Sequence, residues 1–340
     1  MKRIIYFAAL VVLLAGCSKI TQSETPLRDT LISVNVLMPE ILTRAGYDSN
    51  NLPTKFYLSI DQNGTKYDYT NVVMKLEEGK WVAYESDAEN APKKLLLWEG
   101  SANQEGSANP VIVTAATFPL AGGAPYTVSV SDDQSTDANL TASDHLWYYN
   151  ESISPFTHKD GISIEFCHLM SKVKIEIKLK DEYAGINEPV TSVAVLNTKT
   201  QAHYAPKNDS GNLFGNHSNP ASILACKTGY NSGARTATFE VILVPQTVAA
   251  GSFGLSILVG DNTYEWFSTA EVKFASNTIY TLSLTADKDA STRTLTLANE
   301  EVYNKLVANV STEEKTWITG YWKNGAEGAT IILLDGSTLD

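Results

Sequence analysis

The feature that most constrains this chain is one long run of alternating apolar and polar residues, from Ile162 to Leu179. The apolar or aromatic side of the run falls on even positions in its first half and on odd positions in its second: Ile162, Ile164, Phe166, His168, then Val173, Ile175, Ile177, Leu179. A period of two is typical of a strand with one buried face. The change of phase predicts one inserted residue, a bulge between Met170 and Lys172.

A strand of this length would span roughly 60 Å, which is too long for one flat sheet. We therefore expect it to bend at the bulge and to serve two sheet regions. Most of the remaining chain lacks helical periodicity and shows short alternating runs separated by Gly, Asn, Asp, Pro and Ser. That pattern predicts an all-β protein built from antiparallel sandwiches.

The N-terminus indicates the compartment. Lys2 and Arg3 precede an apolar run from Ile4 to Leu14, and Leu14-Ala15-Gly16-Cys17 matches a bacterial lipobox. The run is too short to span a bilayer of about 30 Å as a helix, so residues 1–16 are predicted to be a signal peptide. Cys17 would then carry lipid and anchor the protein. The alternative is an ordinary secretory peptide with a chance cysteine.

Charge and cysteine content limit the function classes. Of 26 basic residues, two lie in the signal peptide, which leaves 24 against 38 acidic residues and a formal charge of −14. Nucleic acid is therefore not an expected partner. After lipidation of Cys17, two cysteines remain, Cys167 and Cys226. Their spacing permits a disulfide but does not require one.

Three segments carry a resemblance to a known family. Phe166-x-His168-x-x-Ser171-Lys172-Val173 is similar to the signature segment of fimbrillins, the lipoprotein pilins of Bacteroidetes type V pili. Asp144-His145-Leu146-Trp147-Tyr148-Tyr149 resembles the segment that precedes it, and the block from Val241 to Leu284 resembles the closing half. The resemblance implies two tandem transthyretin-like β-sandwich domains, a cell-surface location at the outer membrane, and no cofactor.

The expected division follows from composition and from this resemblance. Residues 17–29 are polar and predicted to be a tether. An N-terminal sandwich is expected over 30–185, a second over 186–286, and a C-terminal extension over 287–340, with the boundary placed in the charged stretch Lys180 to Pro189. Strands are expected at 31–38, 55–61, 69–76, 80–84, 94–100, 110–118, 126–130, 190–196, 213–214, 236–244, 252–259, 263–267, 278–285 and 330–334, and a helix at 299–310.

Catalytic chemistry is not expected. The sequence has no Gly-x-Ser-x-Gly, His-Glu-x-x-His, phosphate-cradling glycine loop or Cys-x-x-Cys. The histidines show no metal-ligand spacing, and His168 is predicted to be a hydrogen-bonded core residue. Asp132, Asp133 and Asp137 are interpreted as a solvated turn, with weak calcium binding as the alternative. A carbohydrate-binding site remains an alternative at the aromatic residues Trp317, Tyr321 and Trp322.

The resemblance also implies a mechanism of assembly. In such pilins a protease cuts after an arginine and removes the lipid with the first strand, and a strand of the next subunit fills the groove. Arg44 in Thr43-Arg44-Ala45 stands at the expected cleavage position, with Arg28 as a competing site and an ordinary surface arginine as the alternative. The candidate exchange residues are Ile32, Val34, Val36 and Met38 in the first strand and Ile331, Ile332, Leu333 and Leu334 near the C-terminus.

The expected partners are other pilin subunits, outer-membrane lipid through Cys17, and host or microbial surface ligands. The alternative function is a lipid-anchored surface binding protein, a tip adhesin or an anchor, that does not polymerise.

Overall fold

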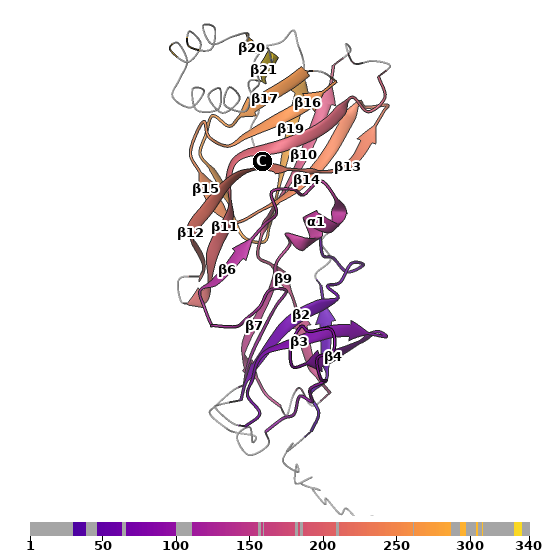
Figure 1. Ribbon diagram of the computed structural model, residues 1–340, viewed down its shortest axis with the longest axis vertical. Helices are drawn as coiled ribbons and strands as arrows, with labels where there is room; N and C mark the ends of the chain where they lie inside the picture. Colours follow the sequence, from indigo (N-terminus) through magenta and orange to yellow (C-terminus); the bar gives the residue numbers. More distant parts are fainter. Residues whose placement is uncertain are drawn as a thin grey trace, which may run out of the picture.

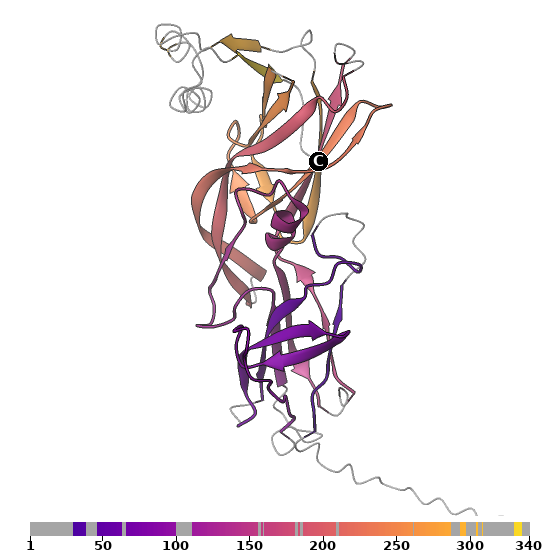
Figure 2. The ribbon, with the colours of Figure 1, turned by 45° about the vertical axis from the view of Figure 1, so that its right-hand side comes forward.

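The computed structural model describes residues 30–38, 46–62, 66–99, 111–155, 158, 160–180, 183, 186–208, 211–260, 262–286, 293–296, 304, 308 and 330–334. These residues build an elongated, nearly all-β molecule in which two groups of sheets stack along the long axis (Figure 1). The view turned by 45° shows the same two halves, with the N-terminal strands in one and the C-terminal strands in the other (Figure 2).

The N-terminal half is a sandwich of a six-stranded sheet and a two-stranded one. The large sheet has the order β4-β3-β2-β5-β7-β9, with all neighbours antiparallel. Its strands are β2 Lys55–Asp61, β3 Tyr69–Glu77, β4 Lys80–Tyr84, β5 Val111–Ala116, β7 Leu146–Ile153 and β9 Cys167–His168. The small sheet pairs β1 Val34–Leu37 with β8 Ile162–Glu165 in parallel. Alternate apolar residues of both sheets, among them Phe56, Leu58, Ile162 and Phe166, form the N-terminal core.

The C-terminal half has a four-stranded sheet of order β13-β14-β10-β19 facing a larger one of order β12-β11-β16-β17-β21-β20. The four-stranded sheet holds β10 Ser171–Leu179, β13 Cys226–Asn231, β14 Thr236–Leu243 and β19 Thr278–Ala286. The larger sheet holds β11 Val190–Asn208, β12 Gly211–Leu224, β16 Gly254–Val259, β17 Asn262–Phe267, β20 Arg293–Thr296 and β21 Thr330–Leu334. A short ribbon pairs β15 Gln246–Val248 with β18 Val272–Phe274.

Two elements connect the halves. β6 Tyr126–Ser129 comes early in the chain but pairs with β11 of the C-terminal half. The helix α1 Asp137–Ala142 lies near the junction and begins at Thr136, whose side chain accepts a hydrogen bond from the N–H of Asn139. An aromatic cluster also spans the junction, with Trp147 of β7 5.2 Å from Tyr204 of β11 and 5.7 Å from Tyr126. Rigid aromatic packing of this kind ties the two cores together.

The long alternating run bends and serves both halves, as its length predicted. It is divided into β8, β9 and β10, and the chain passes from one core to the other at Leu169 and Met170, next to the predicted bulge. The crossing lies one strand before the expected boundary at Lys180 to Pro189, because β10 already pairs with β14 and β19 of the C-terminal half. The charged stretch resembles a linker, but the actual crossing is made by buried apolar residues. The division of the chain into independently folding domains stays a prediction.

Several elements differ from the sequence expectation. The acidic stretch interpreted as a turn contains α1, because Thr136 supplies a cap that hydropathy does not reveal. The segment 94–100 forms only isolated bridges over its described part, and β11 continues well beyond residue 196. β13 was not expected at all. The expected helix at 299–310 lies almost wholly outside the described residues.

Candidate functional site

The first strand, β1, lies in a groove between two other segments. On one side it pairs in parallel with β8, from Val34 opposite Ile162 to Leu37 opposite Glu165. On the other side the preceding residues meet the segment Leu96–Trp98. There the N–H of Ile32 donates to Leu96 O at 2.8 Å, and the N–H of Trp98 donates to Thr30 O at 2.9 Å. The N-terminal segment therefore completes the small sheet.

The groove binds this segment through alternate side chains. Ile32 and Val34 are only 7% and 6% exposed, and Val36 and Met38 are half-buried against the same core. The opposite face is open to solvent, with Leu37 53% exposed. Each buried aliphatic side chain of this size is worth about 1.5 to 3 kcal/mol, so a groove without its strand would expose apolar pockets to water.

The approach of β1 to β8 depends on a glycine. Gly161 has a φ of +128°, and a Cβ added there would lie 2.6 Å from Ser33 Oγ and 2.9 Å from Ser33 O. Ser33 Oγ donates a hydrogen bond to Asp160 O, and the N–H of Ile162 donates to Ser33 O. Gly161 therefore permits the close backbone contact that begins the parallel pairing.

The chain is anchored again directly after the first strand and its connection. The N–H of Tyr47 donates to Asp144 Oδ2 at 2.9 Å, and Asn51 Nδ2 donates to Gly46 O at 2.8 Å. Asp144 also lies 2.9 Å from His168 through Oδ1 and Nδ1. His168 is thus hydrogen-bonded, as predicted, but it is only partly buried and lies outside both cores. Burial and the charge of Asp144 raise the pKa of the Tyr47 hydroxyl.

β1 and β10 hold equivalent positions in the two halves but differ in length and in the number of strands that they pair with. β10 begins the C-terminal half as β1 begins the N-terminal half, and each pairs in parallel with a strand from the end of its own half. However, β10 has 9 residues and lies between two strands, β14 and β19, whereas β1 has 4 residues and pairs with one described strand, β8. β1 is therefore the strand that can leave with little loss of other structure.

The other predicted site residues are only partly placed. Cys17 and Arg44 lie outside the described residues. Residues Ile331 to Leu334 lie in β21, which pairs in parallel with β17 and antiparallel with β20. The apolar run near the C-terminus is therefore an inner strand between two partners. The first strand and β21 occupy different sheets in the two halves.

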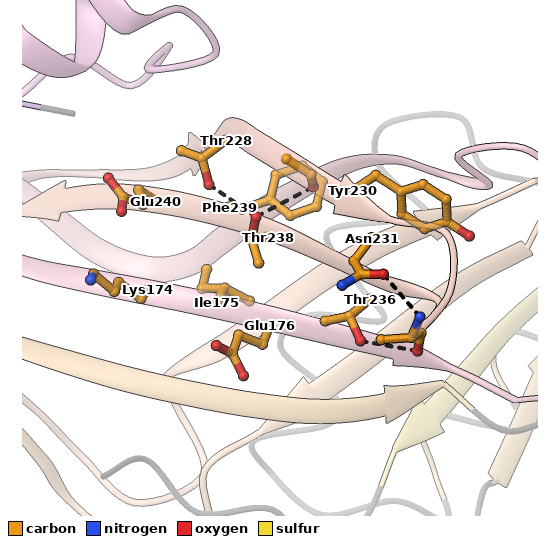
Figure 3. Close-up of a pocket in the computed structure, with 12 residues that line it drawn as sticks. Lys174, Ile175, Glu176, Thr228, Tyr230, Asn231, Thr236, Thr238, Phe239 and Glu240 are labelled. Carbon is orange, nitrogen blue, oxygen red and sulfur yellow. Dashed lines mark hydrogen bonds between the residues drawn. The ribbon is translucent and has the colours of Figure 1, made fainter. Parts of the chain in front are cut away.

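A second candidate site is an open hollow of about 620 Å³ over the four-stranded sheet. Hydroxyls and charges of three strands line it, including Lys174 and Glu176 of β10 and Thr238 of β14 (Figure 3). Thr228 Oγ1 donates to Thr238 Oγ1 at 3.1 Å, which ties β13 to β14 across its floor. Such a surface can accept a ligand rich in hydroxyl groups.

The thiols and the charged groups show no reactive arrangement in the described part of the chain. Cys167 is exposed and Cys226 is buried, and both are free thiols. Burial and a hydrogen bond to Asp137 raise the pKa of Cys226 to about 11. Within the described ranges, no group of three or more His, Cys, Asp or Glu side chains could hold a metal ion. None of the helices described there is long and apolar enough to cross a membrane.

Comparisons with known proteins agree with this architecture. A sequence model of the fimbrillin-like family matches residues 116–313, and a model of the prokaryotic membrane lipoprotein lipid attachment site matches residues 1–18. The search of curated proteins gave no match.

Three solved structures resemble this chain. A candidate cell adhesion protein from Bacteroides ovatus has 15% identity over 77% of this chain and 94% of its own, with a TM-score of 0.50. A candidate cell adhesion protein from Bacteroides uniformis has 17% identity over 76% and 95%, with a TM-score of 0.48. The tip fimbrial protein Mfa3 from Porphyromonas gingivalis, with a C-terminal truncation, has 8% identity over 77% and 96%, with a TM-score of 0.41.

Proposed function

Because this chain belongs to the fimbrillin-like family, we propose that it is a structural subunit of a cell-surface fimbria that mediates adhesion. In this proposal the protein is exported as a lipoprotein through Cys17 and reaches the outer membrane. It is a non-enzymatic protein, in keeping with its family. The subunits assemble by strand exchange after a cut at Arg44.

The observation that carries the proposal is the placement of the first strand. Residues 30–38 fill an apolar groove, while Tyr47 is held independently by Asp144 and Gly46 by Asn51. Arg44 stands in the sequence between these two points. A cut there would separate the strand from the rest of the chain and leave the residues from Gly46 onward anchored.

The proposed donor is the strand Ile331 to Leu334 of a neighbouring subunit. β1 pairs in parallel with β8, and β21 pairs in parallel with β17 over a similar length. Both edges of β21 are paired within its own subunit, so in this proposal the strand leaves β17 and β20 before it pairs in parallel with β8 of the neighbour. Backbone hydrogen bonds would supply affinity, and the pockets of Ile32 and Val34 would set the register.

The test uses an arginine-specific protease and gel filtration. Full-length mature protein is expected to form high-mass species after cleavage, because the emptied groove takes up a strand from another copy. Deletion from Thr330 should give a cleaved chain, and Arg44→Ala an uncleaved chain, that form no high-mass polymer. Equal polymerisation by the tail deletion would exclude this donor, and no polymer from any form would contradict strand exchange.

A second candidate function is a lipid-anchored binding protein that does not polymerise. The hollow lined by Lys174, Glu176 and Thr238 favours it, since this surface could bind a glycan directly. The N-terminal sequence of the protein on the cell surface separates the two functions. A terminus at Ala45 supports the fimbrial subunit, and an acylated Cys17 supports the anchored protein.

A further inference from the structure

The four-stranded sheet of the C-terminal half ends in the edge strand β19. β19 pairs with β10 without a register shift, from Thr278 opposite Ser171 to Ala286 opposite Leu179. Among the described residues no strand pairs with its other edge. Its 9 residues, TIYTLSLTA, include no charged residue and no proline.

The other edges of the described sheets carry the usual protections against association. β12 contains Pro220 and has several register shifts against β11, and β13 has a register shift beside Lys227. β4 is 5 residues long and begins with Lys80, and β20 is 4 residues long and begins with Arg293. Charges, prolines, bulges and short length are what discourage edge-to-edge pairing, and β19 has none of them.

The backbone of β19 shows which groups are presented at this edge. The N–H of Lys180 donates to Ala286 O, so Ala286 directs its backbone groups toward β10. Backbone groups alternate in direction along a strand. The N–H and C=O groups of Ile279, Thr281, Ser283 and Thr285 therefore face away from β10, and the side chains of these residues lie on the outer face of the sheet, where Ile279 is 40% exposed.

We propose that the free edge of β19 is an interface for a second copy of this chain, joined by antiparallel β19–β19 pairing. The register with the most overlap sets Thr281 opposite Ser283 of the second copy and Ile279 opposite Thr285. All four residues point their backbone groups at the partner, so about eight hydrogen bonds form around the twofold axis. The cross-strand pairs are hydroxyl with hydroxyl and β-branched with β-branched, which are favourable combinations.

The sequence of β19 is the reason for choosing a second copy as the partner, because the strand turned antiparallel on itself sets hydroxyl opposite hydroxyl and β-branched opposite β-branched side chains. The chain carries a formal charge of −12 before processing, so two copies repel each other over most of their surfaces. The residues of β19 bring no charge to the contact, and self-pairing sets no like charges opposite each other. This interface does not depend on cleavage at Arg44 and does not involve the groove that holds β1.

The first test is cross-linking of the uncleaved mature chain from residue 18 with Cys167→Ser. Paired Cα atoms in this register are about 5.5 Å apart, which a disulfide can bridge. A mixture of Thr281→Cys and Ser283→Cys proteins should give a disulfide dimer under mild oxidation. Thr281→Cys mixed with Thr247→Cys, an exposed position on β15, is the control. Equal dimer yield from both mixtures, or none from the first, would overturn the proposal.

The second test separates pairing from folding. Thr281→Pro removes an N–H that faces the free edge, a position where a strand tolerates proline, whereas Thr281→Val keeps the N–H. Sedimentation of the uncleaved chain should show dimers for the parent and for Thr281→Val, and at least a tenfold weaker dimer for Thr281→Pro, with unchanged circular dichroism. Dimers of equal strength in all three, or a monomeric parent at high concentration, would contradict β19 pairing.

Discussion

The carboxylate of Asp144 binds the imidazole of His168 at 2.9 Å, at the place where the chain leaves one core and enters the other. The same carboxylate accepts the N–H of Tyr47, so one residue holds the turn after the first strand to the junction. Asp144 thus links the retained end of the chain to both halves of the molecule.

Replacing Asp144 should therefore loosen this anchor. Asp144→Ala leaves the N–H of Tyr47 and Nδ1 of His168 without their partner, which should lower the free energy of unfolding by about 1 to 3 kcal/mol. Hydrogen exchange at Tyr47 should become faster. Asp133→Ala is the control, because Asp133 is exposed and its carboxylate accepts hydrogen bonds from Ser135 within its own turn, and it should change stability by less than about 0.5 kcal/mol.

The N-terminal core should depend strongly on Phe166. This residue is 0% exposed and its ring lies 5.5 Å from that of Phe56. Phe166→Ala should cost about 3 to 5 kcal/mol in denaturant unfolding. Glu165→Ala, on the exposed face of the neighbouring position, should have little effect. A loss below about 1 kcal/mol for Phe166→Ala would mean that the core packs differently.

Gly161 should be more sensitive to substitution than Gly79, another glycine with positive φ. Gly161→Ala meets both the backbone strain and Ser33, so it should destabilise the protein and release the first strand to proteolysis more readily. Gly79 has a φ of +78°, and a Cβ added there would have nothing within 4 Å. Gly79→Ala therefore measures backbone strain at positive φ without a steric contact. The difference in unfolding free energy between the two variants reports the contact with Ser33 together with the larger backbone strain of alanine at a φ of +128°. Equal values would show that the contact contributes nothing.

The two thiols should react at very different rates. Cys226 is 2% exposed and its pKa is raised to about 11, so it stays protonated at pH 8 and reacts slowly. Cys167 is exposed, although burial of its sulfur and nearby Glu165 raise its pKa as well. Maleimide at pH 8 should label one thiol of the folded mature chain from residue 18 and two after denaturation. Labelling of both in the folded state would contradict the burial of Cys226.

Lipid attachment should require Cys17. Cys17→Ser should leave an unprocessed precursor that incorporates no labelled palmitate in cells, since the thiol is the acceptor. Labelling at the level of the parent would exclude the lipobox as the attachment site.

The sequence predicted which residues of a strand face the core, because side chains on a strand alternate between its two faces. The buried set Ile162, Ile164 and Phe166 and the later set Val173, Ile175 and Ile177 follow from that pattern alone, as does the need for a break between them. β2 and β4 were predicted with the bounds that the structure shows. The lipobox was also a purely local signal.

Pairing between distant strands was decided by the tertiary structure. β6 joins β11, β10 joins β19 and β1 joins β8 across long stretches of chain, and alternation does not say which edge a strand will meet. The anchor of Tyr47 on Asp144 and the open edge of β19 depend on those pairings. The sequence by itself determined which faces are buried and where a lipid attachment site lies. Only the fold decided which strand could leave and which edge is unpaired among the described strands, because hydrogen-bond partners are set by long-range packing.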